Sequence, residues 1–248
     1  FTFHDDLIPL TFNGEMLDKP FLGGFNRPKI QWIDWDTDGD IDLFILDASG
    51  YLRYLENQGN ANTPDFRLIT VSYQDIFCGG WFYFADYDFD GDLDLMAQDS
   101  GDSDRISFFR NYYGELGNDT FSAFGLQDVV SSSVMTPTFA DIDDDGGLDF
   151  FTGNMTGTLT FYENTGLNNW MAPLFEHITD TWEDIYIQGG TRIDDRHGAS
   201  AITFIDLDGD GDLDLSWGDY FQQSLYIIWN SGFAESPDMI EVTTEYPP

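Results

Sequence analysis

The chain has 248 residues, of which 42% are hydrophobic and 17% aromatic, and this composition indicates a folded protein rather than a disordered acidic tail. Asp and Glu number 46 against 9 Lys and Arg, which gives a formal net charge of −37. A surface of this charge repels nucleic-acid phosphates and anionic lipid headgroups, so we expect neither nucleic acid binding nor membrane insertion. The same charge repels itself within a compact fold, which indicates that the chain binds cations.

The first predicted element is a strand, Leu7–Phe12, within a partial unit formed by residues 1–25. The chain begins at Phe1 rather than Met, which fits either a mature form after signal removal or a piece of a longer protein. Cys78 is the only cysteine, so an intrachain disulfide is excluded, and we expect a buried, inert thiol. It lies in Ile76–Ala85, an uncharged stretch that is far shorter than the ~18 apolar residues of a membrane span.

A ten-residue acidic segment then recurs four times without gaps, and the first aspartates of the copies are 52, 55 and 65 residues apart. This period is typical of propeller blades and related repeats. The four copies are Asp34–Leu43 (DWDTDGDIDL), Asp86–Leu95 (DYDFDGDLDL), Asp141–Phe150 (DIDDDGGLDF) and Asp206–Leu215 (DLDGDGDLDL). They divide a single β-repeat domain, residues 1–248, into four predicted blades after the partial unit. The predicted blades are residues 26–72, 73–126, 127–180 and 181–248.

Strand-like runs surround every copy. An aromatic residue stands two positions before each loop and an apolar run follows it; the aromatic residues are Trp32, Phe84, Phe139 and Phe204. A second β-rich run ends in an Asn with a Gly two or three positions later, and a short last strand closes the unit. Such runs, separated by Gly, Asn and Asp, predict strands joined by tight turns, and no segment has a helical period. We expect unit boundaries in the turn-rich stretches near Pro64, Thr120, Pro173 and Pro237.

Each unit therefore offers about four strands, which is the content of one propeller blade. A single blade cannot bury both of its faces, so blades must stack against one another to form the core. The sequence predicts an all-β fold of propeller-type blades with four antiparallel strands each. The four complete repeats fit an open or partial propeller, or a four-bladed one.

The recurring pattern D-x-D-x-D-G-x-x-D predicts a metal loop. The aspartates at positions 1, 3 and 5 converge if the chain curls around one point, and the Gly at position 6 permits that curl. We expect position 7 to contribute its backbone carbonyl and position 9 to close the shell with its carboxylate. Hard oxygen ligands in this number suit Ca²⁺, and no His or Cys stands nearby to favour zinc or copper.

We therefore predict about four Ca²⁺ ions, one in each loop. The predicted metal residues are Asp34, Asp36, Asp38, Asp40, Asp42, Asp86, Asp88, Asp90, Asp92, Asp94, Asp141, Asp143, Asp145, Gly147, Asp149, Asp206, Asp208, Asp210, Asp212 and Asp214. Gly147 replaces the position-7 aspartate of the other copies, and a backbone carbonyl ligand survives that change.

Two other structures can contain such a loop sequence, an EF-hand and a simple hairpin turn. An EF-hand opens in the same way but needs a bidentate Glu at position 12 and flanking helices. Position 12 holds no Glu in any copy and β-type sequence flanks every loop, which excludes the EF-hand; the residues are Ile45, Ala97, Thr152 and Trp217. A lone Asp-Gly pair could be only a hairpin turn. Four copies with aspartate at positions 1, 3, 5 and 9 favour metal binding.

The units resemble FG-GAP/VCBS-type repeats, the blades of integrin α-subunit propellers and of many bacterial surface proteins. Asp145–Gly166 resembles the bacterial VCBS form most closely. The resemblance covers nearly the whole chain after residue 25 and implies β-propeller blades with Ca²⁺ between the first and second strands. Two features depart from the family: no literal FG…GAP occurs, although Gly-Gly pairs precede three loops, and family propellers usually have more than four blades. The pairs are Gly23-Gly24, Gly79-Gly80 and Gly189-Gly190.

Three functions are compatible with the sequence. The first is a non-enzymatic extracellular scaffold with structural calcium: an adhesion module, or a self-associating subunit of a surface assembly or filament, whose partners are its own copies or another extracellular protein or glycan. The second is a glycan-binding module of a secreted carbohydrate-active protein, because 7 Trp and 12 Tyr can stack on sugars. The third is a calcium-assisted polysaccharide lyase, which would need a general base and charge neutralisers.

We expect no enzyme and assign no catalytic residue. His4, His177 and His197 are scattered without a motif, and the mixed cluster Asp194–His197 is equally well explained as an inter-strand loop. Asn118 and Asn154 each begin a tripeptide that fits the N-glycosylation acceptor pattern.

Overall fold

A computed structural model describes residues 10–16, 25–26, 28–102, 105–112, 121–126, 137–154, 156–187, 199–219, 224–239 and 244–246. The chain forms two compact units, Phe1–Ile76 and Phe77–Pro248, and each is described by itself.

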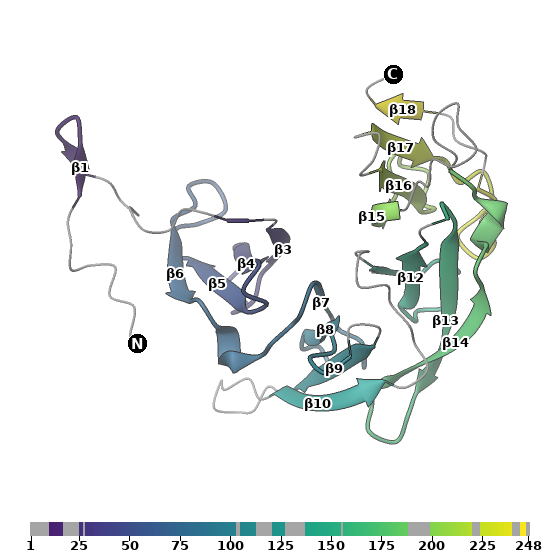
Figure 1. Cartoon of the computed structure of the whole chain (residues 1–248), viewed down its shortest axis with the longest axis horizontal. Helices are drawn as coiled ribbons and strands as arrows, with labels where there is room; N and C mark the ends of the chain where they lie inside the picture. The colour runs from purple at the N-terminus through teal and green to yellow at the C-terminus, as the bar shows by residue number, and fades with distance from the viewer. Residues whose placement is uncertain are drawn as a thin grey trace. The chain divides into compact units, whose positions relative to one another are not determined.

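The first unit contains one sheet of four antiparallel strands, which follow one another in chain order (Figure 1). This sheet, blade 1, consists of β3 (Lys29–Ile33), β4 (Asp42–Leu46), β5 (Leu52–Asn57) and β6 (Phe66–Thr70). A short hairpin of β1 (Thr11–Phe12) and β2 (Glu15–Met16) precedes it. Of the strand predicted at Leu7–Phe12, only Thr11–Phe12 is observed as strand, and residues 7–9 lie outside the described part of the chain.

The second unit contains three more four-stranded antiparallel sheets, each again in chain order. Blade 2 consists of β7 (Phe82–Ala85), β8 (Asp94–Gln98), β9 (Ile106–Asn111) and β10 (Phe121–Leu126). Blade 3 consists of β11 (Thr138–Ala140), β12 (Asp149–Gly153), β13 (Leu159–Leu167) and β14 (Pro173–Thr179). Blade 4 consists of β15 (Ala199–Ile205), β16 (Asp214–Asp219), β17 (Ser224–Ile228) and β18 (Thr244–Tyr246).

These sheets confirm the predicted fold class, all-β with four propeller-type blades of four antiparallel strands. The helical elements of the described residues are two 3₁₀ turns, η2 (Tyr73–Asp75) and η3 (Trp182–Asp184). The exact limits of the predicted units stay a prediction.

The turn-rich stretches near Pro64, Pro173 and Pro237 do not separate blades, so that part of the prediction is wrong. Pro64 lies between β5 and β6, Pro173 begins β14, and Pro237 lies between β17 and β18. Each stretch joins the third strand of a blade to the fourth. Thr120, the fourth of these positions, lies outside the described residues.

The second strands of blades 2 and 3 are wholly buried. All five residues of β8 and all five of β12 are buried, whereas β6 at the edge of blade 1 alternates between half-buried and exposed positions. A strand that is covered on both faces has apolar residues in succession rather than in alternation. This burial explains why a continuous apolar run follows every loop.

Within the second unit, blades pack through the aromatic residue that precedes each loop. Phe139 of blade 3 contacts the rings of Trp81 and Tyr87 of blade 2, with ring centroids 6.4 Å and 5.4 Å apart. Phe204 of blade 4 contacts Phe151 and Trp182 of blade 3 at 4.5 Å and 5.6 Å. The residues belong to two buried clusters, so the predicted stacking of blades is observed there.

Cys78 is fully buried, and this burial raises the pKa of its thiol to about 12, so the thiol stays protonated at neutral pH. The expected inert cysteine is confirmed. Among the described residues, no helix has the length and hydropathy needed to cross a bilayer.

Candidate metal sites

Each acidic loop connects the first strand of a blade to the second, as the sequence predicts. In all four blades the register pairs the residue before position 1 with the aspartate at position 9; the pairs are Ile33–Asp42, Ala85–Asp94, Ala140–Asp149 and Ile205–Asp214. Because the same antiparallel pair closes every loop, the four loops have equal length and start from equivalent points.

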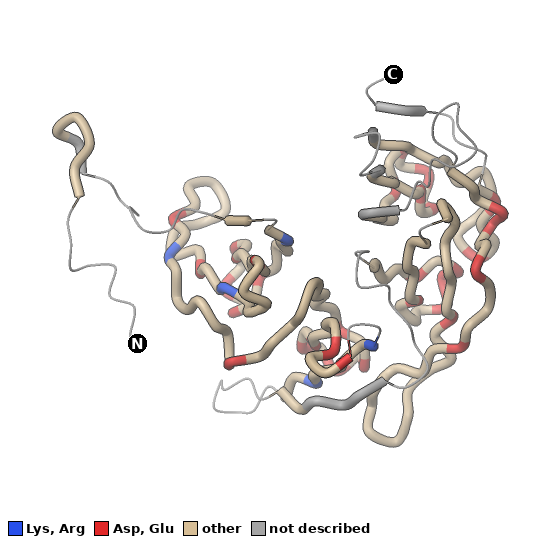
Figure 2. Tube along the Cα trace, in the orientation of Figure 1, with Lys and Arg blue, Asp and Glu red and all other residues tan. Residues whose placement is uncertain are grey.

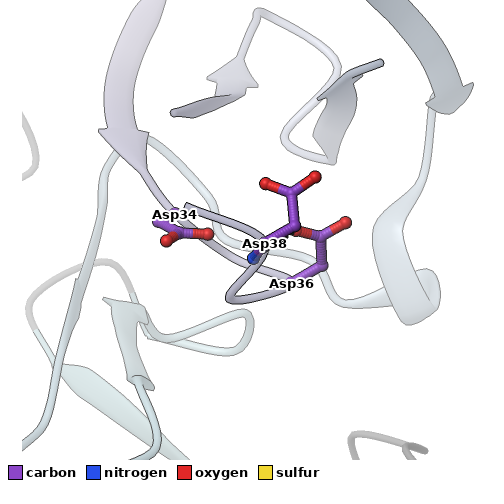
Figure 3. Close-up of side chains that lie close together, drawn as sticks. All are labelled: Asp34, Asp36 and Asp38. Carbon is purple, nitrogen blue, oxygen red and sulfur yellow. Dashed lines mark hydrogen bonds between the residues drawn. The ribbon is translucent and has the colours of Figure 1, made fainter. Parts of the chain in front are cut away.

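The aspartates at positions 1, 3 and 5 converge in every loop. One carboxylate oxygen from each of three aspartates lies within 4.8 Å of the other two, in four groups: Asp34, Asp36 and Asp38; Asp86, Asp88 and Asp90; Asp141, Asp143 and Asp145; Asp206, Asp208 and Asp210. Figure 3 shows the first group along its loop. Acidic residues greatly outnumber basic ones along the described chain (Figure 2), so few positive side chains are available to neutralise these carboxylates.

The curl of each loop is held by a hydrogen bond across it. The backbone N–H of the position-6 glycine donates to the position-1 carboxylate at 3.1–3.2 Å in all four copies. These glycines, Gly39, Gly91, Gly146 and Gly211, have φ between 93° and 100°. A side chain is strained in this left-handed region, which accounts for glycine at position 6.

Position 4 is also left-handed, which the sequence reasoning missed. The residues there are Thr37, Phe89, Asp144 and Gly209, with φ between 56° and 82°. Bulky Phe89 is uncommon in this conformation, and its side chain is 63% exposed. Gly209 was the only sequence signal for this second turn.

The position-9 aspartates are almost fully buried and fasten the loop to the sheet. In all four blades one oxygen of this aspartate accepts a hydrogen bond of 2.7–2.9 Å from the backbone N–H of the recurring Asn, which lies in or just after the third strand. The donors are Asn57, Asn111, Asn164 and Asn230. In three blades the other oxygen accepts from the backbone N–H of loop position 2; these donors are Trp35, Ile142 and Leu207. Position 9 therefore has a structural role beside the metal-ligand role predicted for it.

The recurring Asn is the second residue type whose role only the structure reveals. Asn57 Oδ1 accepts from the backbone N–H groups of Gly59 and Asp65, at 3.1 Å and 2.8 Å. Asn230 Oδ1 makes the same two bonds with Gly232 and Asp238. The Asn thus links its loop aspartate to the turn that leads into the fourth strand, which explains the Asn and Gly spacing seen in the sequence.

Burial makes two of the position-9 carboxylates, those of Asp94 and Asp149, costly to ionise. It raises the pKa of Asp94 and of Asp149 to about 7, against hydrogen bonds from Asn111 and Asn164 that lower it, and the nearby loop aspartates add to the rise. Partial desolvation within the loop, followed by neighbouring aspartates, also raises the pKa of Asp36 at position 3, although its side chain is exposed. A divalent cation would reverse this balance, because it stabilises the ionised carboxylates.

The loops fit an oxygen-ligated cation on a second ground. Oδ1 of Asp34 and Oδ1 of Asp141 are buried, and neither accepts a hydrogen bond. A buried carboxylate oxygen without a donor is unfavourable unless a cation faces it. The position-7 residues Asp40, Asp92, Gly147 and Asp212, and the position-9 aspartates, are not in the groups whose oxygens all lie within 4.8 Å of one another, so their predicted ligation stays a prediction.

Residues 34–97 match the model of the FG-GAP-like repeat. The matched segment runs from the first aspartate of the blade 1 loop into β8, and so includes the loops of blades 1 and 2. The chain is therefore similar to FG-GAP repeat proteins over this segment, in agreement with the resemblance noted from the sequence. No curated protein matches the chain.

Proposed function

We propose that the chain is a calcium-stabilised extracellular β-repeat protein with a structural or adhesive role. The observation that carries this proposal is that every blade has a loop in which oxygens of three aspartates lie within 4.8 Å of one another. Ca²⁺ takes six to eight oxygen ligands, whereas zinc and copper favour the His and Cys that these groups lack. Extracellular modules bind Ca²⁺ at ~10⁻⁴–10⁻³ M, and the similarity to FG-GAP repeats supports the same location.

The bound ions would be structural rather than catalytic. His177, the histidine within the described residues, lies with its Nε2 3.0 Å from Asp180 Oδ1, which also accepts from Thr160 Oγ1. This contact joins β14 to the turn that follows it and leads to no loop aspartate. The other candidates, His4 and Asp194–His197, lie outside the described residues. We therefore keep the proposal of a non-enzymatic protein.

The side-chain nitrogen of Asn154, the first residue of an N-glycosylation tripeptide, makes hydrogen bonds within the fold. Asn154 Nδ2 donates to Thr158 Oγ1 at 3.0 Å and to Thr160 Oγ1 at 2.9 Å. Attachment of a glycan replaces one of the two Nδ2 hydrogens and so would break at least one of these bonds, and we therefore propose that Asn154 carries no glycan in the folded chain. Asn118 lies outside the described residues.

The metal assignment predicts different effects for two neighbouring substitutions in blade 3. Asp149→Asn should lose one bound Ca²⁺, because it removes the closing charge but keeps an oxygen for the Asn164 N–H. Gly147→Ala should keep the ion. Its Cβ would lie 3.0 Å from Asp145 Oδ1 and 3.3 Å from Asn164 Cβ, a crowding that small shifts relieve, and the other blades carry Asp there. Metal analysis after gel filtration counts the ions. Equal calcium in Asp149→Asn and wild type would show that position 9 is not a ligand.

The proposed partner is a second copy of the chain. Phe139 and Phe204 each pack on the preceding blade, and Trp32 holds the same position in blade 1. Trp32 is 51% exposed, and Ile30 on the same face of β3 is 54% exposed. Since this face has the residues that receive a blade elsewhere in the chain, we propose that a blade of another copy covers it. The contact joins unlike surfaces, and so would build a ring or a filament.

Substitution of Trp32 tests this association. In millimolar calcium, light scattering of the wild type should give a mass above the 28.2 kDa of one chain, and Trp32→Ser should lower it towards that value. Trp170→Ser is the matched control, because Trp170 is 65% exposed in the β13–β14 connection, and it should still associate. A monodisperse single-chain species of the wild type at every concentration would contradict the proposal and favour a closed four-bladed monomer.

A further inference from the structure

Blade 2 has a basic side chain inside its acidic loop. Arg110 lies on β9, directly before the recurring Asn111. Its Nε is 2.6 Å from Asp88 Oδ2, a close ion pair, and its Nη2 donates to Asp90 Oδ2 at 3.2 Å. Asp88 and Asp90 are positions 3 and 5 of the loop, two of the three aspartates that converge there. One guanidinium therefore neutralises part of the charge that a cation would neutralise in this loop.

The burial of Asp88 follows from this pairing. The Asp88 side chain is fully buried and that of Arg110 is 16% exposed. The position-3 counterparts are more accessible: Asp36 and Asp208 are exposed and Asp143 is half-buried. A buried carboxylate is costly without a partner charge, so the position-3 aspartate is buried in the one blade where an arginine covers it.

The guanidinium is held in place by the residue two positions on. Arg110 Cζ lies 4.8 Å from the centre of the Tyr112 ring, which is the distance of a cation–π contact. No other blade has this Arg-Asn-Tyr sequence; the corresponding segments are Glu56-Asn57-Gln58, Glu163-Asn164-Thr165 and Trp229-Asn230-Ser231. The arginine is thus positioned from both sides, by two carboxylates and a ring.

The residue at the Arg110 position gives the other loops a different charge. Glu56 raises the pKa of Asp36, after burial and nearer aspartates, so it acts on the blade 1 loop. Glu163 lines a hollow together with Asp145, Gly146 and Gly147 of the blade 3 loop. Where blade 2 has a positive charge, blades 1 and 3 have a further negative one. The charge of the ligand set is one determinant of calcium affinity in such loops.

We propose that Arg110 is a built-in cation that substitutes for calcium in blade 2. This inference rests on the proposed function. The blade 2 loop is held closed by Arg110 without metal, and it binds Ca²⁺ at least about tenfold more weakly than the other loops. The chain then has three tight calcium sites, in blades 1, 3 and 4, rather than four equivalent ones.

Calcium titration of the metal-free protein by calorimetry tests the assignment. The wild type should show three tight sites, and Arg110→Gln should show four, because it frees Asp88 and Asp90. Arg105→Gln is the matched control: it removes the same charge from the residue directly before β9, where the Arg105 side chain is 55% exposed and pairs with Asp102 outside the loop. It should keep three tight sites. Four equivalent tight sites in the wild type would overturn the inference.

A second pair of variants leaves Arg110 intact, in case its removal prevents folding. Asp141→Asn in blade 3 should reduce the tight sites from three to two, whereas Asp86→Asn at the same position of blade 2 should leave three. Loss of one tight site in both variants would overturn the inference while leaving the proposed function in place. The absence of tight calcium sites from the wild type would overturn both.

Discussion

Withdrawal of calcium with excess EDTA is expected to lower the melting temperature of the chain by roughly 6–28 °C. A ligand that binds only the native state stabilises it by roughly 2.7 kcal/mol per site at ~100 Kd of free ligand. In 5 mM calcium, with dissociation constants of ~10⁻⁴–10⁻³ M, the free ligand is at about 5–50 Kd and each site contributes roughly 1–2.3 kcal/mol. Three sites then contribute about 3–7 kcal/mol, and each kcal/mol corresponds to roughly 2–4 °C for a chain of this size. The converging carboxylates within 4.8 Å also repel one another once the cations leave.

Thermal melts followed by circular dichroism, in 5 mM calcium and in EDTA, measure this effect. The control is a melt in EDTA with added NaCl, because salt screens exposed charges without binding at the loops. Salt should recover only a small part of the lost stability. An unchanged melting temperature in EDTA would contradict a structural role for calcium.

The calcium-free chain is expected to be more stable at pH 5 than at pH 8, and calcium should abolish or reverse this order. Burial raises the folded-state pKa of Asp94 and Asp149 to about 7, from 3.8. The folded state therefore holds more protons than the unfolded state between about pH 4 and pH 7. The stability that the protonated Asp94 and Asp149 contribute is fully present below that window and is lost as the pH rises through it. With calcium bound the carboxylates are ionised, and acid instead competes with the metal.

Melting temperatures in calcium-free buffer across pH 5–8 check the sign of this dependence. Asp47, Asp99 and Asp180 have a lowered pKa, so they act at more acidic pH and do not offset the effect in this window. Replacement of both Asp94 and Asp149 by Asn should reduce the slope of the curve, because neither amide titrates; Asp212, whose pKa desolvation raises to about 6, keeps part of the slope. Higher stability of the calcium-free wild type at pH 8 than at pH 5 would refute the explanation.

The repeat carried most of the fold prediction. The same loop pattern occurs four times, each time with an aromatic residue two positions ahead of it. Because the loop has a fixed length and β-type sequence on both sides, it predicts the first and second strands of every blade. The packing of Phe139 and Phe204 then follows from their place before the loop. The boundary predicted at Pro64 is wrong, because Asn57 binds the turn at Pro64 within one sheet and a turn-forming residue does not by itself separate two blades.

The remaining features depend on contacts that no local pattern contains. The pairing of Arg110 with Asp88 requires that β8 and β9 align so that the end of β9 faces the loop before β8, a matter of register. The left-handed backbone at Phe89 could not be predicted, because phenylalanine rarely adopts that conformation. The structural role of Asp94 depends on its distance from Asn111, seventeen residues further on. Spacing predicted which residues converge, but not which charges they meet.

The most direct test of the calcium sites is a crystal structure grown in millimolar calcium, with an anomalous difference map that locates the ions. We expect a peak in the loops of blades 1, 3 and 4, roughly 2.3–2.6 Å from the carboxylate oxygens of positions 1, 3 and 5. A map without anomalous density at any of the four loops would contradict the account.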